Sequence, residues 1–163
     1  MERFAVTTER PYDILIGKGI LDQSGKYIKE CVNPCRVCII TDSKVNKLYS
    51  KILSSSLEGN GFETHKIVFP EGEYSKSIAT YANVLESLAE KAFSRSDIII
   101  ALGGGVVGDL SGFAAATYLR GIRYIPHHFH TTFIDHIKNN LNIIVRQNSL
   151  KQIKNSLDRK SVV

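Results

Sequence analysis

The sequence contains no tryptophan, one methionine and only three cysteines. The cysteines, Cys31, Cys35 and Cys38, lie close together, and an odd number of them does not indicate a disulfide framework. Cys35 and Cys38 have C-x-x-C spacing, but they run into an expected strand, where positions i and i+3 point to opposite faces. We therefore interpret all three as small core residues, and not as a redox or zinc-binding pair.

Long apolar runs are absent as well. No stretch of about 18 uninterrupted apolar residues occurs, so we expect no membrane span. The N-terminal segment is charged and has no apolar run before a small-residue cleavage site, so we expect no secretory signal. With 43% apolar and 23% charged residues, the composition is typical of a soluble globular domain. These features predict a cytoplasmic protein without a membrane partner.

The excess of positive charge is placed unevenly along the chain. The net charge is +5, but residues 1–126 carry 15 Lys and Arg against 14 Asp and Glu, whereas residues 127–163 carry 6 against 2. A nucleic-acid interface requires a basic patch on the folded part of a protein. We therefore expect no nucleic-acid partner.

Short apolar runs alternate with amphipathic segments as far as residue 126. Such alternation predicts βαβ units and an α/β fold, Rossmann-like, with a mostly parallel sheet and flanking helices. An N-terminal β-hairpin is expected before these units. The expected strands are 4–8, 12–16, 36–41, 63–69, 97–102 and 123–125, and the expected helices are 20–32, a segment from Asp42 or Ser43 to near Gly59, 77–92 and 109–119.

The character of the chain changes after Pro126. All 12 glycines lie at or before Gly121, and the rest of the chain is rich in His, Asn, Lys and Ile. We expect residues 1–126 to form one nucleotide-binding domain and residues 127–163 to be an atypical tail. A non-native or frameshifted origin is one interpretation of this tail. The tail is expected to pack poorly, with a helix allowed over Ile134–Ile144 and no further strand–turn–helix unit.

A glycine-rich segment lies between an expected buried strand and a helix. Gly103, Gly105 and Gly108 fit the spacing G-x-G-x-x-G, which lets backbone N–H groups approach a phosphate at a helix N-terminus. No acidic residue follows about 20 positions later, and no Gly-Lys-Ser/Thr follows, so the pattern alone is weak and is not a P-loop. The alternative is a tight turn that uses glycine for packing. Loops at Asp42, Glu71 and Gly103 all follow strands, and parallel sheets bind ligands at that edge.

A longer match makes the glycine segment more specific. The chain reads GGGVVGDL from Gly103 and GFAAATYLRGI from Gly112, which closely resembles the nucleotide loop and following helix of 3-dehydroquinate synthases. FPEGEYSK from Phe69 resembles the second NAD-contacting loop of that family, and Thr41-Asp42 resembles the first. The resemblance covers roughly residues 5–126, and a match of about 20 residues is far more specific than a six-residue pattern.

The resemblance implies a tightly held NAD. Asp42 would contact the adenosine ribose, Glu71 and Lys76 would contact the nucleotide, and the segment from Gly104 to Asp109 would hold the pyrophosphate and neighbouring ribose. Arg120 would reach the substrate phosphate of a neighbouring subunit in a homodimer. The alternative for Asp42 and Lys76 is a solvated helix start, and for Arg120 a charge near a helix C-terminus. The expected cofactor-binding residues are Asp42, Glu71, Gly72, Glu73, Lys76, Gly104, Gly105, Val106, Val107, Gly108, Asp109, Thr131 and Thr132.

Two departures from the family pattern stand out. Lys44 replaces an Asn that is common in the family. After Ile125 the family continues with Pro-Thr-Thr, an Asp and a Gly-Gly-Lys-Thr segment, whereas this chain has Thr131 and Thr132 displaced and lacks the lysine. The C-terminal helical domain that binds zinc or cobalt in the family is expected to be absent. We expect no metal site in its place, although the tail contains His127, His128, His130 and His136.

The resemblance implies a part in the shikimate pathway and aromatic amino acid biosynthesis. The family enzyme is a lyase that cyclises a seven-carbon phosphorylated keto sugar acid to 3-dehydroquinate and eliminates phosphate. This chain would be its NAD-binding half and is expected to be inactive alone. The alternatives are a related sugar-phosphate cyclase, a fragment of an iron-type alcohol or glycerol dehydrogenase, and a non-catalytic nucleotide-binding remnant.

Overall fold

A computed structural model of the chain describes residues 2–6, 12–129 and 141–147. The strands are β1 (Glu2–Val6), β2 (Tyr12–Lys18), β3 (Arg36–Asp42), β4 (Glu63–Phe69), β5 (Ile98–Gly103), β6 (Arg123–Phe129) and β7 (Leu141–Gln147). The helices are α1 (Ser24–Lys29), α2 (Ser43–Val45), α3 (Lys51–Glu58), α4 (Ile78–Glu90) and α5 (Gly105–Thr117), with a π-helical turn η1 (Asn46–Ser50) and 3₁₀ turns η2 (Glu73–Ser75) and η3 (Tyr118–Arg120).

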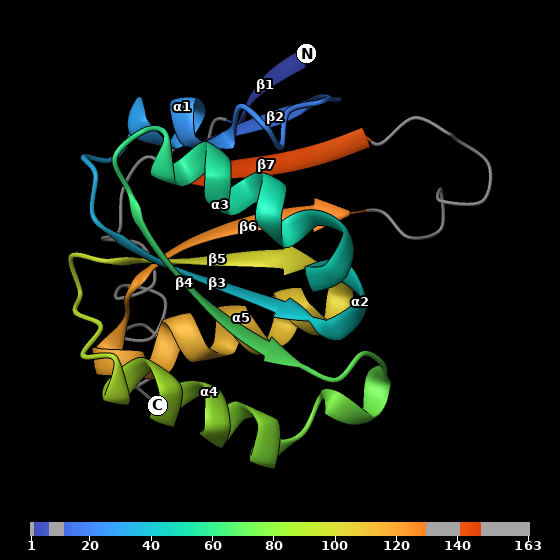
Figure 1. Cartoon of the computed structure of the whole chain (residues 1–163), viewed down its shortest axis with the longest axis vertical. Coiled ribbons are helices and arrows are strands. Elements are labelled where there is room, and N and C mark those ends of the chain that lie inside the picture. The colour runs from blue at the N-terminus through green and yellow to red at the C-terminus, as the bar shows by residue number, and fades with distance from the viewer. Residues whose placement is uncertain (1, 7–11, 130–140, 148–163) are drawn as a thin grey trace, which may run out of the picture.

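The strands form one mixed sheet with the order β1-β2-β7-β6-β5-β3-β4. Strands β6, β5, β3 and β4 pair in parallel, and the hairpin β1–β2 is antiparallel. The predicted Rossmann-like α/β fold with an N-terminal hairpin is therefore confirmed. The helices lie in two layers, with α1 and α3 on one face of the sheet and α4 and α5 on the other (Figure 1).

The sheet separates two apolar cores, and its buried strands contribute side chains to both. Along β3, Val37 and Ile39 pack with Leu53 and Leu57 on the α3 side, whereas Cys38 and Ile40 belong to the core on the side of α4 and α5. All residues of β5 are buried. Such continuous burial arises because successive side chains of a strand point to opposite faces and helices cover both faces.

The C-terminal part of the chain departs from the sequence prediction. Strand β6 passes the expected boundary at Pro126 and runs to Phe129, and residues 141–147 form β7. Strand β7 pairs antiparallel with β2 over seven residues and with β6, so it connects the hairpin to the parallel sheet. The helix allowed over Ile134–Ile144 is therefore wrong for residues 141–144, which are paired as a strand. Residues 134–140 lie outside the described ranges, and the poor packing expected of the tail stays a prediction.

Two helices begin elsewhere than predicted. The helix expected from residue 109 begins at Gly105, since Gly108 N donates to Gly104 O at 2.9 Å and closes the first helical turn. The helix expected over 20–32 is limited to α1, with residue 21 in a bend and residues 22–23 in a turn. The helix expected near Asp42 is confirmed as the continuous run of α2, η1 and α3.

The cysteines divide by exposure. Cys38 is fully buried in β3, as predicted, and Cys35 is half-buried. Cys31 is exposed, so its interpretation as a core residue is wrong, because α1 ends at Lys29 and the chain leaves the core there.

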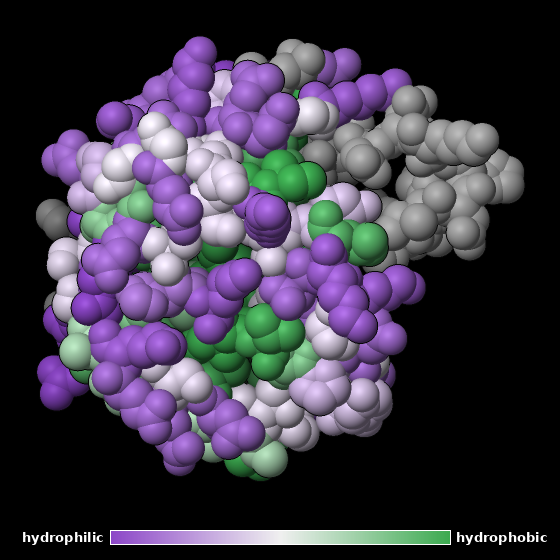
Figure 2. Space-filling view, in the orientation of Figure 1, coloured by the Kyte–Doolittle hydropathy of each residue, from purple (hydrophilic) through white to green (hydrophobic). Residues whose placement is uncertain are grey.

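In the described ranges no helix is long and apolar enough to cross a membrane. Apolar side chains gather on one face over the edge strand β4, between α3 and α4 (Figure 2).

Candidate functional site

Three loops meet at one edge of the sheet, where β3, β4 and β5 end. These strands are parallel neighbours in the order β5-β3-β4, so their carboxyl ends point the same way. The hydroxyl of Thr41 at the end of β3 donates to Leu102 O at 2.7 Å and ties β3 to β5. A cleft of about 330 Å³ opens between the loops. It is lined by Asp42, Lys44, Val45, Leu48, Tyr49, Phe69, Glu71, Gly72, Gly104, Gly105, Val106 and Val107.

The glycines of the segment from Gly103 to Gly108 have different roles. A Cβ atom on Gly103 would lie 2.6 Å from Cγ2 of Val107, so Gly103 is required for packing. A Cβ atom on Gly105 would meet nothing within 4 Å, although Gly105 is the first residue of α5 and lines the cleft. The packing interpretation of the segment therefore applies to Gly103, whereas the space beside Gly105 is open.

Asp42 lies at the cleft and also caps a helix. Its Oδ1 accepts hydrogen bonds from the backbone N–H groups of Lys44 at 2.9 Å and Val45 at 2.8 Å. This N-cap stabilises the start of α2 by satisfying donors that have no intrahelical partner. The predicted helix start at Asp42 or Ser43 is confirmed, and Asp42 also lines the cleft.

A hydrogen bond connects the loop after β4 to the loop after β3. Glu71 N donates to Ser43 Oγ at 3.2 Å. Gly72 has a φ of 110°, a left-handed conformation that favours glycine, and a Cβ there would lie 2.7 Å from the Tyr74 ring. Glu71 and Gly72 both line the cleft, as the sequence predicted for their loop.

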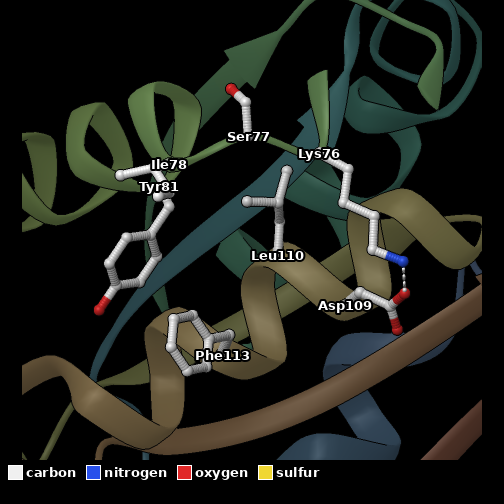
Figure 3. Close-up of a pocket in the computed structure, with 7 residues that line it drawn as sticks. All are labelled: Lys76, Ser77, Ile78, Tyr81, Asp109, Leu110 and Phe113. Atoms are coloured by element: carbon white, nitrogen blue, oxygen red, sulfur yellow. Dashed lines mark ion pairs between the residues drawn. The ribbon is translucent and has the colours of Figure 1, made fainter. Parts of the chain in front are cut away.

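Lys76 and Asp109 lie beside the cleft and contact each other. Their side chains form an ion pair of 2.7 Å, and Lys76 Nζ lies 3.9 Å from a carboxylate oxygen of Glu73. The hydrogen bond to Asp109 raises the pKa of Lys76. Both residues line a second pocket, of about 340 Å³, between the start of α4 and the middle of α5 (Figure 3). Lys76, Asp109, Glu73 and Gly108 are not among the residues that line the cleft.

The other predicted site residues lie elsewhere. Arg120 is exposed beyond the C-terminal end of α5, a helix of 13 residues that is about 20 Å long, so it lies far from the glycine end of that helix. Thr131 and Thr132 lie outside the described residues, as do His130 and His136. His127 is buried, with Nε2 3.2 Å from Ser24 Oγ. Among the described residues, no group of three or more His, Cys, Asp and Glu could hold a metal ion.

The sequence reasoning missed the apolar wall of the cleft. Val45, Leu48 and Tyr49 come from the run of α2 and η1, and Phe69 ends β4. The helical spacing of Val45 and Leu48 indicates a face toward the core, but Leu48 is 57% exposed and lines the cleft instead. The sequence places Ser43 only at the start of a helix, and its contact with Glu71 depends on β3 and β4 lying side by side.

Four neighbouring parallel strands, covered by helices on both faces, have a cleft at their carboxyl ends. This arrangement defines the class of Rossmann-like α/β domains, which bind ligands at that edge. The chain belongs to the 3-dehydroquinate synthase N-terminal family, whose model matches residues 66–156.

Curated relatives are similar over most of this chain. It is 53% identical over 115 residues to the 3-dehydroquinate synthase of Streptococcus suis, covering 71% of this chain and 32% of the relative. It is 47% identical over 117 residues to that of Clostridium acetobutylicum, covering 72% of this chain and 33% of the relative. The chain therefore spans about a third of the length of these relatives.

Solved structures support the same fold. One is a 2-deoxy-scyllo-inosose synthase complexed with carbaglucose-6-phosphate, NAD⁺ and Co²⁺, with a TM-score of 0.67 and 25% identity over 76% of this chain and 33% of that chain. Another is the 2-epi-5-epi-valiolone synthase from Streptomyces hygroscopicus with NAD⁺ and Zn²⁺ bound, with a TM-score of 0.60 and 28% identity over 76% of this chain and 34% of that chain. Glycerol dehydrogenase from Schizosaccharomyces pombe shares the fold at 21% identity and a TM-score of 0.53, covering 66% of this chain and 25% of that chain.

Proposed function

We propose that the cleft holds NAD and that this chain is the NAD-binding part of a 3-dehydroquinate synthase. The observation that carries the proposal is the open position at Gly105, where a Cβ would meet nothing within 4 Å at the first residue of α5. The first N–H groups of a helix lack intrahelical partners, and the helix dipole adds partial positive charge there. An anion such as a pyrophosphate is therefore favoured at this end of α5.

The other walls of the cleft suit a nucleoside. Asp42 and Glu71 supply carboxylate acceptors for ribose hydroxyls, and Val45, Leu48 and Tyr49 supply an apolar surface for a base. At about 330 Å³ the cleft is at the small end of the range of roughly 300–1,000 Å³ for ligand sites, so we assign it the adenosine and pyrophosphate part of NAD. Bound NAD would supply a hydride acceptor for the enzyme.

The proposed reaction is that of the family: cyclisation of a phosphorylated keto sugar acid, with loss of phosphate, in the shikimate pathway of the cytoplasm. The described residues contribute no ligand set for the zinc or cobalt of the family, so we assign no metal-dependent step to them. We place the cofactor cleft within residues 1–126. Arg120, exposed and about 20 Å from the cleft along α5, is proposed to serve a neighbouring subunit in a homodimer.

The test is a titration of NAD into isotope-labelled protein. We expect shifts of the backbone amides of Gly104–Val107 and Glu71, with a dissociation constant in the high micromolar to millimolar range, because the cleft covers only part of the dinucleotide. We expect no phosphate release from the substrate by this chain alone. Absence of shifts at Gly104–Val107 at millimolar NAD would refute the proposal, and phosphate release above background would refute the assignment of this chain as a binding part only.

A non-catalytic nucleotide-binding protein is the second candidate. The observation that favours it is the lack of a metal-holding group among the described residues. The two candidates differ in one respect. The experiment mixes this chain with the metal-binding domain of a relative and measures phosphate release from the substrate. Phosphate release would favour the first candidate, whereas NAD binding without phosphate release would favour the second.

A further inference from the structure

The second pocket, between α4 and α5, has an apolar outer surface. Ile78 and Phe113 line this pocket and are 86% and 58% exposed. The Tyr81 ring lies 4.8 Å from the Phe113 ring, and the Tyr81 hydroxyl is hydrogen-bonded to the Thr117 hydroxyl at 2.7 Å. Figure 3 shows Ile78 and Tyr81 of α4 and Phe113 of α5 around the pocket. Because these contacts join the two helices, the surface is already formed in the single chain.

We call Ile78, Tyr81 and Phe113 the α4–α5 surface. Single exposed apolar residues are common in proteins, but large ones grouped around a pocket are typical of contact sites. Aromatic side chains are also enriched in protein–protein interfaces. The α4–α5 surface therefore suits apolar side chains of a second protein surface.

Exposed charges of opposite sign lie at the two ends of this surface. Helices α4 and α5 follow β4 and β5, so both begin at the carboxyl edge of the sheet and end at the opposite edge. In residues 70–77 and 104–110, around the helix starts, the exposed charged residues are three acids and one base: Glu71, Glu73, Asp109 and Lys76. In residues 87–97 and 117–122, around the helix ends, they are three bases and one acid: Lys91, Arg95, Arg120 and Glu90. One end of the surface is therefore negative and the other positive.

This distribution of charge is self-complementary about a twofold axis. In a twofold dimer the same surface of each subunit meets its own copy. If the two α5 helices are antiparallel, the negative end of each surface faces the positive end of the other, which favours association. Phe113 lies midway between Asp109 and Thr117, which are exposed on the same side of α5. An axis through Phe113 would place Arg120 near Val106 of the partner subunit, a residue of the cleft, since each is seven positions from residue 113.

We propose that the α4–α5 surface is the contact surface of a twofold dimer of this chain. In this dimer the α5 helices are antiparallel, Phe113 lies at the axis, and Arg120 of each subunit lies beside the cleft of the other. The inference deepens the proposed function by naming the face that brings Arg120 to a neighbouring subunit. It rests on that function only for the role of Arg120, because the contact itself requires no cofactor.

Sedimentation equilibrium of the NAD-free protein measures the dissociation constant of the dimer. We expect a constant on the order of 10 µM, since the surface is small for an interface. Phe113→Ser and Ile78→Ser should each raise it at least about tenfold, because each removes an apolar side chain from the contact. Phe4→Ser is the matched control: Phe4 is 48% exposed, but it lies in β1 at the far edge of the sheet, so the constant should not change. Arg120→Glu should also weaken the dimer, and so should added salt.

A disulfide cross-link tests the position of the axis. In a Cys31→Ser background, mild oxidation of Phe113→Cys should give a covalent dimer, because a residue at a twofold axis meets its own copy. Phe4→Cys in the same background should give none. A dimer that Phe113→Cys does not cross-link would overturn the inference.

The remaining outcomes separate this inference from its alternatives. A chain that is monomeric at about 1 mM, or a dimer that Phe113→Ser leaves unchanged, would overturn the inference. The curated relatives are longer than this chain, and a monomer that binds the metal-binding domain of a relative through Phe113 would assign the surface to that domain instead. A dimer that binds no NAD would refute the proposed function and leave the contact surface standing.

Discussion

At the scale of single residues, two glycines separated by one residue, Gly103 and Gly105, have different surroundings. Gly103 ends β5 against Val107, which is buried, and Gly105 begins α5 beside an open cleft. Only the surroundings of each Cβ position distinguish them, since both positions have negative φ and neither is required for an unusual backbone conformation.

This difference gives a matched pair of variants. Gly105→Ala should preserve stability, changing the free energy of unfolding by no more than about 1 kcal/mol, because alanine favours helix and the methyl group meets no neighbour. It should weaken NAD binding at least about tenfold, which corresponds to about 1.4 kcal/mol, by occupying the place of the pyrophosphate. Gly103→Ala should lower stability by about 1–3 kcal/mol through overpacking against Val107. Urea unfolding measures the stability of each variant, and NAD titration measures its affinity for NAD. An NAD affinity of Gly105→Ala equal to that of the unchanged protein would contradict the assignment of the cleft.

The cysteines give a second prediction at this scale. Burial raises the pKa of the Cys38 thiol to about 12, so it is protonated and inaccessible in the folded protein. Cys31 is exposed. Reaction with an alkylating agent at pH 8, followed by mass spectrometry, should modify Cys31 first and leave Cys38 unmodified until denaturant is added. Rapid modification of Cys38 in the native protein would show that β3 is accessible.

At the scale of elements, α5 and β7 carry the differences from the predicted structure. The earlier start of α5 puts Gly105–Gly108 in the first helical turn, so the segment between β5 and the helix is only Gly104. Tyr124 of β6 fixes this turn by donating to Gly108 O at 2.9 Å. Strand β7 lies between β2 and β6 and therefore holds the N-terminal hairpin onto the parallel strands.

The position of β7 predicts the effect of a proline. Ile144 pairs with Leu15 of β2 and with His127 of β6. Ile144→Pro removes a backbone donor in the interior of the sheet and should lower the free energy of unfolding by at least about 2 kcal/mol. Ile144→Val, which keeps the N–H group, should cost no more than about 1.5 kcal/mol. Urea unfolding tests the pair, and hydrogen exchange should find the amides of residues 141–147 protected. Fast exchange there would contradict the observed pairing.

At the scale of the whole molecule, stability should depend on alkaline pH. Burial raises the pKa of Cys38 from 9.0 to about 12 and that of Tyr124 from 10.0 to about 12. Since both pKa values are higher in the folded state, the unfolded chain loses these protons first as the pH rises. The stabilisation is complete below about pH 9 and is lost progressively towards pH 12.

The measurement is the free energy of unfolding as a function of pH. Each group should contribute a slope of up to about 1.4 kcal/mol per pH unit in its own window. Cys38→Ala should have lower stability at neutral pH because of the cavity, and a flatter decline above pH 9. An unchanged slope in Cys38→Ala would mean that the thiol is ionised in the folded state as easily as in the unfolded one.

Much of the fold was predictable because its signals are local. The apolar strand at Ile98–Leu102 and the helix starts at Ser77 and Asp42 depend on residues that are neighbours in sequence, and each appears near its predicted position. The glycine segment and the Asp42 and Glu71 loops were also correctly assigned to one sheet edge, since parallel strands place their carboxyl ends together.

Tertiary structure decided what sequence could not. Strand β7 pairs with β2 across more than 120 positions of chain, and no local pattern reports a partner at that separation. Whether a glycine packs or opens a cleft depends on which side chain faces its absent Cβ, as the contrast between Gly103 and Gly105 demonstrates. Lys76 and Asp109 each fitted a cofactor contact as single residues, and only the approach of the β4–α4 segment to α5 brings them within 2.7 Å of each other. The sequence by itself determined the elements and the edge of the sheet that carries the cleft, because these follow from period and order; the pairing of distant groups follows from packing, which exists only in the folded chain.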